Sequence, residues 1–196
     1  MKKLIPQDAV LLPDSAQLKF EGKIFDVYQW QQRLFDGSEQ TFEMLKRADT
    51  VTAICILDGK VLVIDDEQPH LGMRASFPGG RVDDTDDSLE TAAQREVLEE
   101  TGHSFKQWRL VKVTQPYRKM EWFVYTYIAW DPAGQQPASL DPGEKITVKE
   151  LPFDAVKQLV LDDKDYLGES KILFEKAQDV QELLDLPEFQ GQQVDR

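Results

Sequence analysis

Cysteine and histidine are nearly missing from this chain of 196 residues. Cys55 is the one cysteine and lies in an apolar run, so no disulfide can form within the chain and we expect a buried packing role for it. The two histidines, His70 and His103, are not paired into any metal-binding pattern, and we expect them to be ordinary polar side chains rather than metal ligands. The sequence therefore gives no indication of a thiolate or histidine metal centre.

Basic residues are also scarce, since 23 lysines and arginines stand against 36 aspartates and glutamates, for a formal net charge of −13. A surface of this sign repels nucleic acid and anionic membranes, so we expect neither as a partner. No apolar segment reaches the length of a transmembrane helix, and the N-terminal residues lack the apolar stretch of a signal peptide. We expect a cytoplasmic protein in which a phosphate-bearing substrate depends on bound divalent cations.

With 41% hydrophobic residues, the chain can bury one good core but is too short for two full-sized domains. The segment 35–38 is typical of a turn between extended segments, and Asp58-Gly59 between two apolar runs is the strongest short-range signal for a β-hairpin. We expect an N-terminal arm over 1–17, a β-rich dimerisation subdomain over 18–47, a catalytic domain over 48–188 and a flexible tail over 189–196.

A helix is predicted over 88–101, because this segment lacks glycine and proline, is rich in Ala, Glu and Leu, and is followed by Gly102. Asp87 or Ser88 can cap its start. Strands are expected at 108–115, 122–130 and 146–148, and helices at 153–161 and 170–186. Strands on both sides of a central helix predict an α+β fold, a sandwich of layers around a mixed β-sheet.

Three glutamates of the predicted helix are candidates for a metal site. Glu96, Glu99 and Glu100 follow one another at i, i+3 and i+4, so their carboxylates share one face, and that face begins with apolar residues that favour burial. In a chain this acidic, an ordinary solvated helix face is the alternative. Arg95 beside the cluster and the glycine turn 77–80 before it favour a site, for which oxygen ligands would suit Mg²⁺ or Mn²⁺.

The segment 80–103 closely resembles the Nudix box, Gly-x5-Glu-x7-Arg-Glu-U-x-Glu-Glu-x-Gly-U, where U is aliphatic. The match holds residue for residue from Arg95 to Gly102. It departs in one extra residue before Arg95, in Asp86 or Asp87 at the first glutamate, and in His103 at the last aliphatic position. The resemblance implies a Nudix-type α/β/α sandwich and a hydrolase in which Glu96, Glu99, Glu100 and the Gly79 carbonyl bind the metal.

Over about residues 20–160 the chain looks most like the ADP-ribose pyrophosphatase branch of that family. The resemblance implies a homodimer formed through an N-terminal β-subdomain and a small nucleotide-sugar substrate, with AMP and ribose 5-phosphate as the products from ADP-ribose. It also implies a downstream glutamate as general base, for which Glu144 is the matching residue. An arginine that several members carry before the glycine loop is not evident, and Arg74 or Arg81 could replace it.

Within the same branch, Phe42 matches a position that stacks adenine and Arg47 one that contacts phosphate, while Pro116 lies close to a proline of the sugar side. Phe25 and Trp30 are further stacking candidates, and ordinary strand packing is the alternative for these aromatics. The expected site residues are, for catalysis, Glu144, Arg95 and Glu99; for the metal, Glu96, Glu99, Glu100 and Gly79; and for the substrate, Phe42, Arg47, Arg81 and Pro116.

Two other functions remain open at this stage. A nucleoside-triphosphate pyrophosphohydrolase would use the same box but would have less use for the N-terminal subdomain. A Nudix-fold sensor would bind a nucleotide without cleaving it, and such sensors usually lose box carboxylates that are present here.

Overall fold

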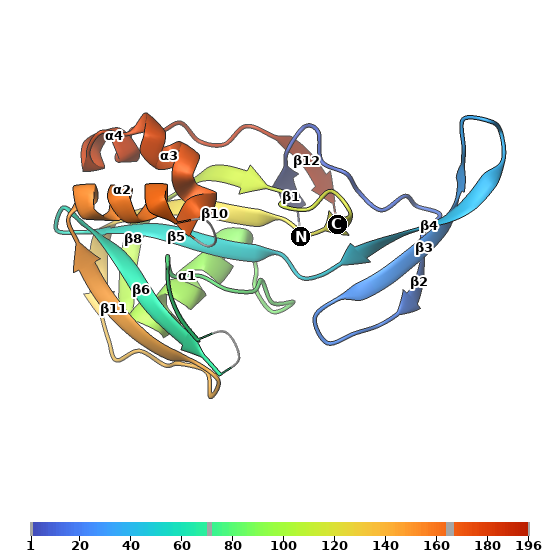
Figure 1. The fold of residues 1–196 in the computed structure, drawn as a ribbon. Helices are drawn as coiled ribbons and strands as arrows, with labels where there is room; N and C mark the ends of the chain where they lie inside the picture. Colours follow the sequence, from blue (N-terminus) through green and yellow to red (C-terminus); the bar gives the residue numbers. More distant parts are fainter. Residues whose placement is uncertain (1, 70–71, 164–166, 196) are drawn as a thin grey trace.

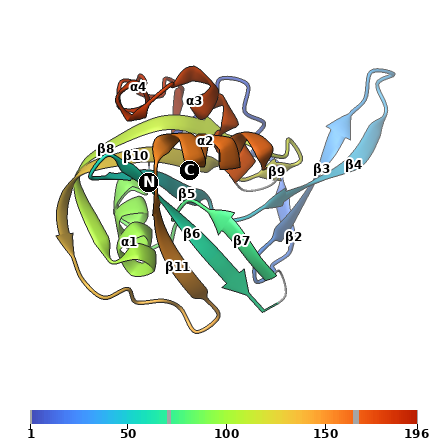
Figure 2. The ribbon, with the colours of Figure 1, turned by 60° about the vertical axis from the view of Figure 1, so that its left-hand side comes forward.

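A computed structural model describes residues 2–69, 72–163 and 167–195. Its centre is a β-sheet with the strand order β11 (Lys145–Leu151), β6 (Lys60–Gln68), β5 (Thr50–Leu57), β10 (Val124–Gln135) and β8 (His103–Thr114), and with β7 (Gly72–Ser76) paired to β6. Strand β10 runs parallel to β5 and antiparallel to β8. Helices lie on both faces of this mixed sheet (Figures 1 and 2), which confirms the expected α+β sandwich.

The two faces of the sheet carry separate hydrophobic cores. Helix α1 (Leu89–Thr101) packs on one face, and α2 (Phe153–Asp162), the 3₁₀ turn η1 (Leu167–Ser170), α3 (Lys171–Lys176) and α4 (Val180–Leu184) cover the other. Strand β5 serves both, because alternate side chains point to opposite faces: Cys55 packs with the α1 core and Ile54 with the α2–α4 core. The expected burial of Cys55 is confirmed. Within the described ranges, none of the helices has the length and apolar content needed to cross a membrane.

Helix α1 begins and ends at the residues that its capping signals indicate. The Ser88 hydroxyl accepts from the Thr91 backbone N–H at 3.1 Å, and the Thr91 hydroxyl accepts from the Ser88 N–H at 2.8 Å, which forms a capping box. At the other end, Gly102 has φ of 72° and donates to the Leu98 carbonyl. Ser88, rather than Asp87, is therefore the N-cap.

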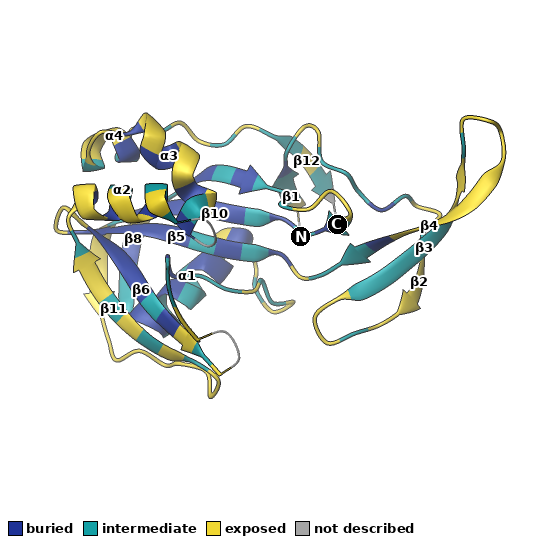
Figure 3. Cartoon of the chain, in the orientation of Figure 1, coloured by how far each residue is buried: buried dark blue, intermediate teal, exposed yellow. Residues whose placement is uncertain are grey.

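The N-terminal residues form a second, smaller sheet. Strands β2 (Gln17–Phe20), β3 (Asp26–Arg33) and β4 (Glu39–Lys46) make two antiparallel hairpins, and β9 (Met120–Glu121) of the catalytic part pairs in parallel with β4. The predicted turn lies between β3 and β4, where Gly37 has φ of 88°. This sheet projects from the main body (Figure 1), and most of its outer residues are exposed (Figure 3).

Two segments differ from expectation. The helix predicted over 170–186 is divided into α3 and α4, because the Asp179 carboxylate accepts from the Glu182 backbone N–H and so starts a new helix. The expected flexible tail contains a strand, β12 (Gln192–Asp195), which pairs with β1 (Lys2–Ile5) of the N-terminal arm. Ile5 is fully buried in the α1 core, so this pairing ties both ends of the chain to the main body.

Candidate active site

A cavity of about 380 Å³ lies beside the C-terminal half of α1 and is lined mainly by charged side chains. Its walls come from the glycine loop after β7, from α1 and from the segment before β11. The lining residues are Gly80, Arg81, Asp83, Arg95, Glu96, Glu99, Glu100, Ser139, Asp141 and Glu144. The structure thus brings the three helix glutamates together with Glu144, which is more than forty residues away in the sequence.

The two loop glycines lie close to β5 and to the helix carboxylates, and the backbone requires glycine at the first of them, Gly79. The Pro78 and Gly80 carbonyls accept from β5 at 2.9 Å each, so the loop follows the strand closely. A Cβ atom at Gly79, where φ is 151°, would lie 2.2 Å from the Val51 carbonyl oxygen, and one at Gly80 would lie 2.5 Å from Glu96 Oε2. The Gly79 N–H in turn donates to Glu100 Oε2 at 2.7 Å, which fixes the most buried of the glutamates.

Arg95 holds several acids around the cavity in place. Its Nη1 donates to Glu96 Oε1 at 2.8 Å and to Glu99 Oε2 at 3.1 Å. Its Nε and Nη2 each donate to Asp86 at 3.0 Å, which lowers the pKa of Asp86. Asp86 is therefore the acid that pairs with the arginine, whereas Asp87 is exposed.

Burial places the helix carboxylates in an unfavourable electrostatic environment. Burial first, and neighbouring carboxylates after it, raise the pKa of Glu100 to about 9 against the opposing Gly79 N–H. Burial also raises the pKa of Glu96 to about 7, even though Arg95 opposes this shift. The pKa of Glu144 is raised as well, mainly by its burial. A bound cation would relieve this desolvation by stabilising the ionised forms.

The donor set fits a hard divalent cation. Among the described residues, no three carboxylate, imidazole or thiol groups converge on a preformed metal cage. Instead, the carboxylates of Glu96 and Glu99 are held by Arg95 and that of Glu100 by the Gly79 N–H, all on the wall of one cavity. Carboxylate and carbonyl oxygens of this kind match the ligand preference of Mg²⁺ and Mn²⁺ rather than that of thiolate-binding metals.

Glu144 reaches the cavity from a tight turn directly before β11. Its backbone N–H donates to the Asp141 carbonyl at 2.9 Å, and the Asp141 N–H donates back to Glu144 Oε2 at 3.3 Å. The negative charge of Glu144 contributes to the raised pKa of both Glu96 and Glu100. The carboxylate thus lines the same cavity as the helix glutamates.

The residues predicted to bind the substrate do not all line the acidic cavity. Arg81 lines the cavity and pairs with Asp83 at 2.8 Å. The Arg47 guanidinium lies over the rings of Trp122 and Phe25, at 4.7 and 5.6 Å from their centres, and the charge of Arg81 helps to lower its pKa after burial. The structure therefore places Arg47 and Arg81 near each other.

Phe42 and Pro116 are not among the cavity-lining residues. Phe42 lies on the projecting sheet against Trp30, with 6.2 Å between ring centres, so the chain by itself does not bring it to Arg47. Pro116 is half-buried in the turn between β8 and β9. Sequence reasoning missed Trp122, because no local spacing connects it with Arg47, which precedes it by many residues. His70 lies outside the described residues, and His103 lies at the start of β8.

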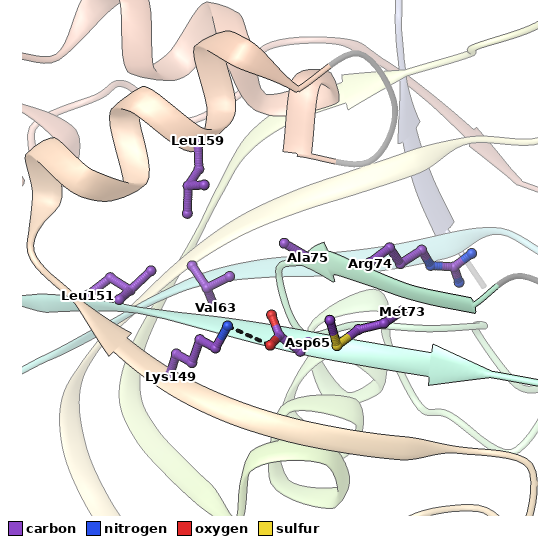
Figure 4. A pocket seen from close by; sticks show the side chains of 8 residues that line it. All are labelled: Val63, Asp65, Met73, Arg74, Ala75, Lys149, Leu151 and Leu159. Atoms are coloured by element: carbon purple, nitrogen blue, oxygen red, sulfur yellow. Dashed lines mark ion pairs between the residues drawn. The ribbon is translucent and has the colours of Figure 1, made fainter.

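A second cavity, of about 280 Å³, lies on the opposite face of β6 (Figure 4). It is mostly apolar and contains one ion pair, between Asp65 and Lys149. Its lining comes from β6, β7, β11 and α2 and consists of Val63, Asp65, Met73, Arg74, Ala75, Lys149, Leu151 and Leu159. With a single acid already paired to a lysine, it offers no comparable chemistry, so the acidic cavity is the candidate active site.

Comparisons with known proteins give the family of the chain. The NUDIX domain matches residues 46–173, well over half of the chain. A curated relative from Bacillus subtilis (strain 168), named ADP-ribose pyrophosphatase, is 26% identical over 147 residues, which cover 72% of this chain and 78% of the relative.

Solved structures agree in fold. One described as the crystal structure of an ADP compounds hydrolase has a TM-score of 0.64 at 19% identity and covers 93% of both chains. A NUDIX hydrolase from Nitrosomonas europaea has a TM-score of 0.52 at 23% identity and covers 65% of this chain and 87% of that one. At these identities the likeness concerns the fold alone.

Proposed function

The chain belongs to the Nudix family and is a hydrolase, and from this premise we propose that it cleaves the diphosphate bridge of a nucleoside diphosphate sugar, with ADP-ribose as the first candidate. The observation that carries the proposal is the single cavity shared by Glu96, Glu99, Glu100 and Glu144. The curated relative named ADP-ribose pyrophosphatase supports the choice of substrate class.

We propose that Glu96, Glu99, Glu100 and the Gly79 carbonyl would hold Mg²⁺ (or Mn²⁺), which when bound neutralises the diphosphate charge and lowers the pKa of a water molecule. Arg95 keeps the glutamates in place through its hydrogen bonds to Glu96 and Glu99. In this role Arg95 positions the glutamates that would hold the metal ion.

Glu144 acts as the general base. Its raised pKa brings it closer to the working pH, which favours proton transfer from the attacking water. The water oxygen bonds to one phosphorus of the bridge, the bond from that phosphorus to the bridging oxygen breaks, and the water proton moves to the Glu144 carboxylate. From ADP-ribose the products are AMP and ribose 5-phosphate.

The neighbourhood of Arg47 supports a substrate that is held at both ends. The Nε atom of Arg47 is buried and has no hydrogen-bond partner among the described residues, and Arg81 lies near enough to affect its pKa. Two arginines of this kind suit a phosphate. A nucleoside triphosphate would lack the second sugar and forfeit part of that positioning, and orientation can supply ~7–11 kcal/mol of a barrier.

A steady-state screen with Mg²⁺ over ADP-ribose, ADP-glucose, GDP-mannose, NADH and the deoxynucleoside triphosphates tests this function. We expect kcat/KM for an ADP-sugar to exceed that for any triphosphate at least about tenfold, a gap of ~1.4 kcal/mol. EDTA should abolish activity, and Glu100→Gln should lower kcat on the order of 10³-fold, because a metal-assisted step loses several kcal/mol with a ligand. A triphosphate as the best substrate would refute the specificity, and full activity in EDTA would refute the metal site.

A further inference from the structure

Asp66 is a buried carboxylate of β6 that lies outside the Nudix box and outside the walls of the acidic cavity. Leu62 of the same strand packs in the α1 core, whereas Val61 and Val63 pack in the α2–α4 core. Because side chains two residues apart on a strand share a face, Asp66 points toward the α1 side. Its neighbour Asp65 points to the other side, where it pairs with Lys149 (Figure 4).

The strand register brings Asp66 opposite the start of β11. Ile146 of β11 lies directly opposite Asp66, and Glu144 precedes Ile146 by two residues, in the turn that leads into β11. The negative charge of Asp66 also contributes to the raised pKa of Glu144 and of Glu100. The carboxylates of Asp66, Glu100 and Glu144, from β6, α1 and the turn before β11, therefore influence one another electrostatically.

One oxygen of the Asp66 carboxylate has hydrogen-bond partners, whereas the other has none among the described residues. Oδ2 accepts from Arg74 Nη2 and from Gln68 Nε2, each at 3.0 Å. Oδ1 is buried and has no hydrogen-bond partner among the residues that the structure describes, and the side chain as a whole is only 8% exposed. A buried carboxylate oxygen left without a partner is costly. A cation or its hydration water would satisfy it.

We propose that Asp66 is a positioning residue of the divalent-cation site, where its Oδ1 accepts a hydrogen bond from a water of the cation's hydration shell. The inference rests on the proposed function, since the cation is the one bound by the glutamates of α1. Asp66 thereby extends the site from the box helix to the central sheet. Arg74 and Gln68 fix the carboxylate by occupying its other oxygen.

Titration of the full-length protein with Mn²⁺, followed by calorimetry and by the electron paramagnetic resonance of free Mn²⁺, tests the proposal. We expect Asp66→Asn to weaken binding at least about tenfold, the lower range for residues that orient metal ligands. Asp65→Asn is the matched control, because it removes the neighbouring carboxylate on the opposite face, and its affinity should stay within about twofold of the unchanged protein. Equal affinities for Asp66→Asn and the unchanged protein would overturn the proposal.

Two further variants separate the possible failures. Arg74→Gln removes a partner that fixes the Asp66 carboxylate but keeps the carboxylate itself, so we expect it to lose less Mn²⁺ affinity than Asp66→Asn does. If Arg74→Gln lost as much affinity as Asp66→Asn, the effect would belong to the local packing of β6 and β7 and the proposal would be wrong. Glu100→Gln reports on the site itself: if it and the unchanged protein both fail to bind Mn²⁺, the proposed function fails together with this inference. Loss in Glu100→Gln without loss in Asp66→Asn overturns the inference alone.

Discussion

At the scale of single residues, Arg95 determines how the acids around the cavity are arranged. One guanidinium reaches the helix glutamates with one nitrogen and Asp86 with two others. Without Asp86, the arginine would lose two of its hydrogen bonds and would keep the one from Nη2 to the Arg81 carbonyl at 2.9 Å.

The contrast between Asp86 and Asp87 gives a direct test of this role. We expect Asp86→Asn to lower the free energy of unfolding by about 1–3 kcal/mol, because two hydrogen bonds between charged groups are weakened. Asp87→Asn, at an exposed neighbouring position, should change it by less than about 0.5 kcal/mol. Urea unfolding of both variants in EDTA provides the measurement. Equal effects in the two variants would mean that Arg95 does not depend on Asp86.

The proposed base can be tested separately from the metal site. We expect Glu144→Gln to lower kcat by about 10²–10⁴-fold, the usual contribution of a positioned base, with KM within about threefold. Glu150→Gln, on β11, is the control, since Glu150 pairs with Lys60 in solvent and its substitution should leave kcat unchanged. Initial rates with ADP-ribose distinguish the two. An unaltered kcat in Glu144→Gln would exclude this residue as the base.

Sequence reasoning placed the helix glutamates on one face from their spacing, because i, i+3 and i+4 positions share a face in any α-helix, and predicted a site there from Arg95, the glycine turn and the resemblance to the Nudix box. It could not choose between Asp86 and Asp87, because the extra residue of the loop makes either one compatible with the pattern. That choice depends on how the loop turns over α1, and only the hydrogen bonds of Arg95 identify Asp86. The pairing of Arg47 with Trp122 was likewise inaccessible, since it depends on β9 running beside β4.

At the scale of elements, the glycine loop and α1 work as a unit. Gly79 has a positive φ, lies against β5 and donates to Glu100, so one residue connects sheet, loop and helix. The helix signals were local and strong, and the predicted bounds of α1 agree with the structure almost to the residue. The segment 170–186 was mispredicted as a single helix because its helical composition conceals the capping residue Asp179.

Substitution of the loop glycine tests this unit. We expect Gly79→Ala to lower the free energy of unfolding by at least about 2 kcal/mol, because the added Cβ would lie 2.2 Å from the Val51 carbonyl oxygen and because φ is 151°. Gly143→Ala is the control, since a Cβ there would meet nothing within 4 Å, and it should stay within about 0.5 kcal/mol. Denaturant melts of the two variants give the comparison. A Gly79→Ala protein as stable as Gly143→Ala would show that the loop can move away from β5.

At the scale of the whole molecule, pairs of strands that are far apart in the sequence cannot be predicted from local sequence patterns. Strands β1 and β12 come from opposite ends of the chain and pair with each other, so the tail that was expected to be flexible contains a strand. No local signal predicts this pairing, because each strand is short and polar at the surface. The fold class of the central sheet, by contrast, could be predicted, because its apolar runs and hairpin turns are strong sequence signals for strands.

The projecting sheet buries few of its own apolar side chains. Only Met44 among its large apolar side chains is buried, whereas Phe20 and Ile24 are each 62% exposed. A few strands without a covered apolar face are marginally stable by themselves. Figure 3 shows these strands extending into solvent with little of the main body over them.

We therefore predict a homodimer in which a second copy covers this sheet, because isologous contact between identical apolar faces is the commonest way to bury them. Light scattering at micromolar concentration should report about twice the chain mass of 22.5 kDa. Phe20→Glu should shift the protein toward monomer by placing a charge in the contact. Ile172→Glu, at an exposed apolar position on α3, is the matched control and should remain dimeric. A monomer at 50 µM, roughly 50 times a micromolar dissociation constant, would contradict the prediction. It would also weaken the assignment to ADP-sugars, because the N-terminal sheet would then lack the role that the family resemblance implies.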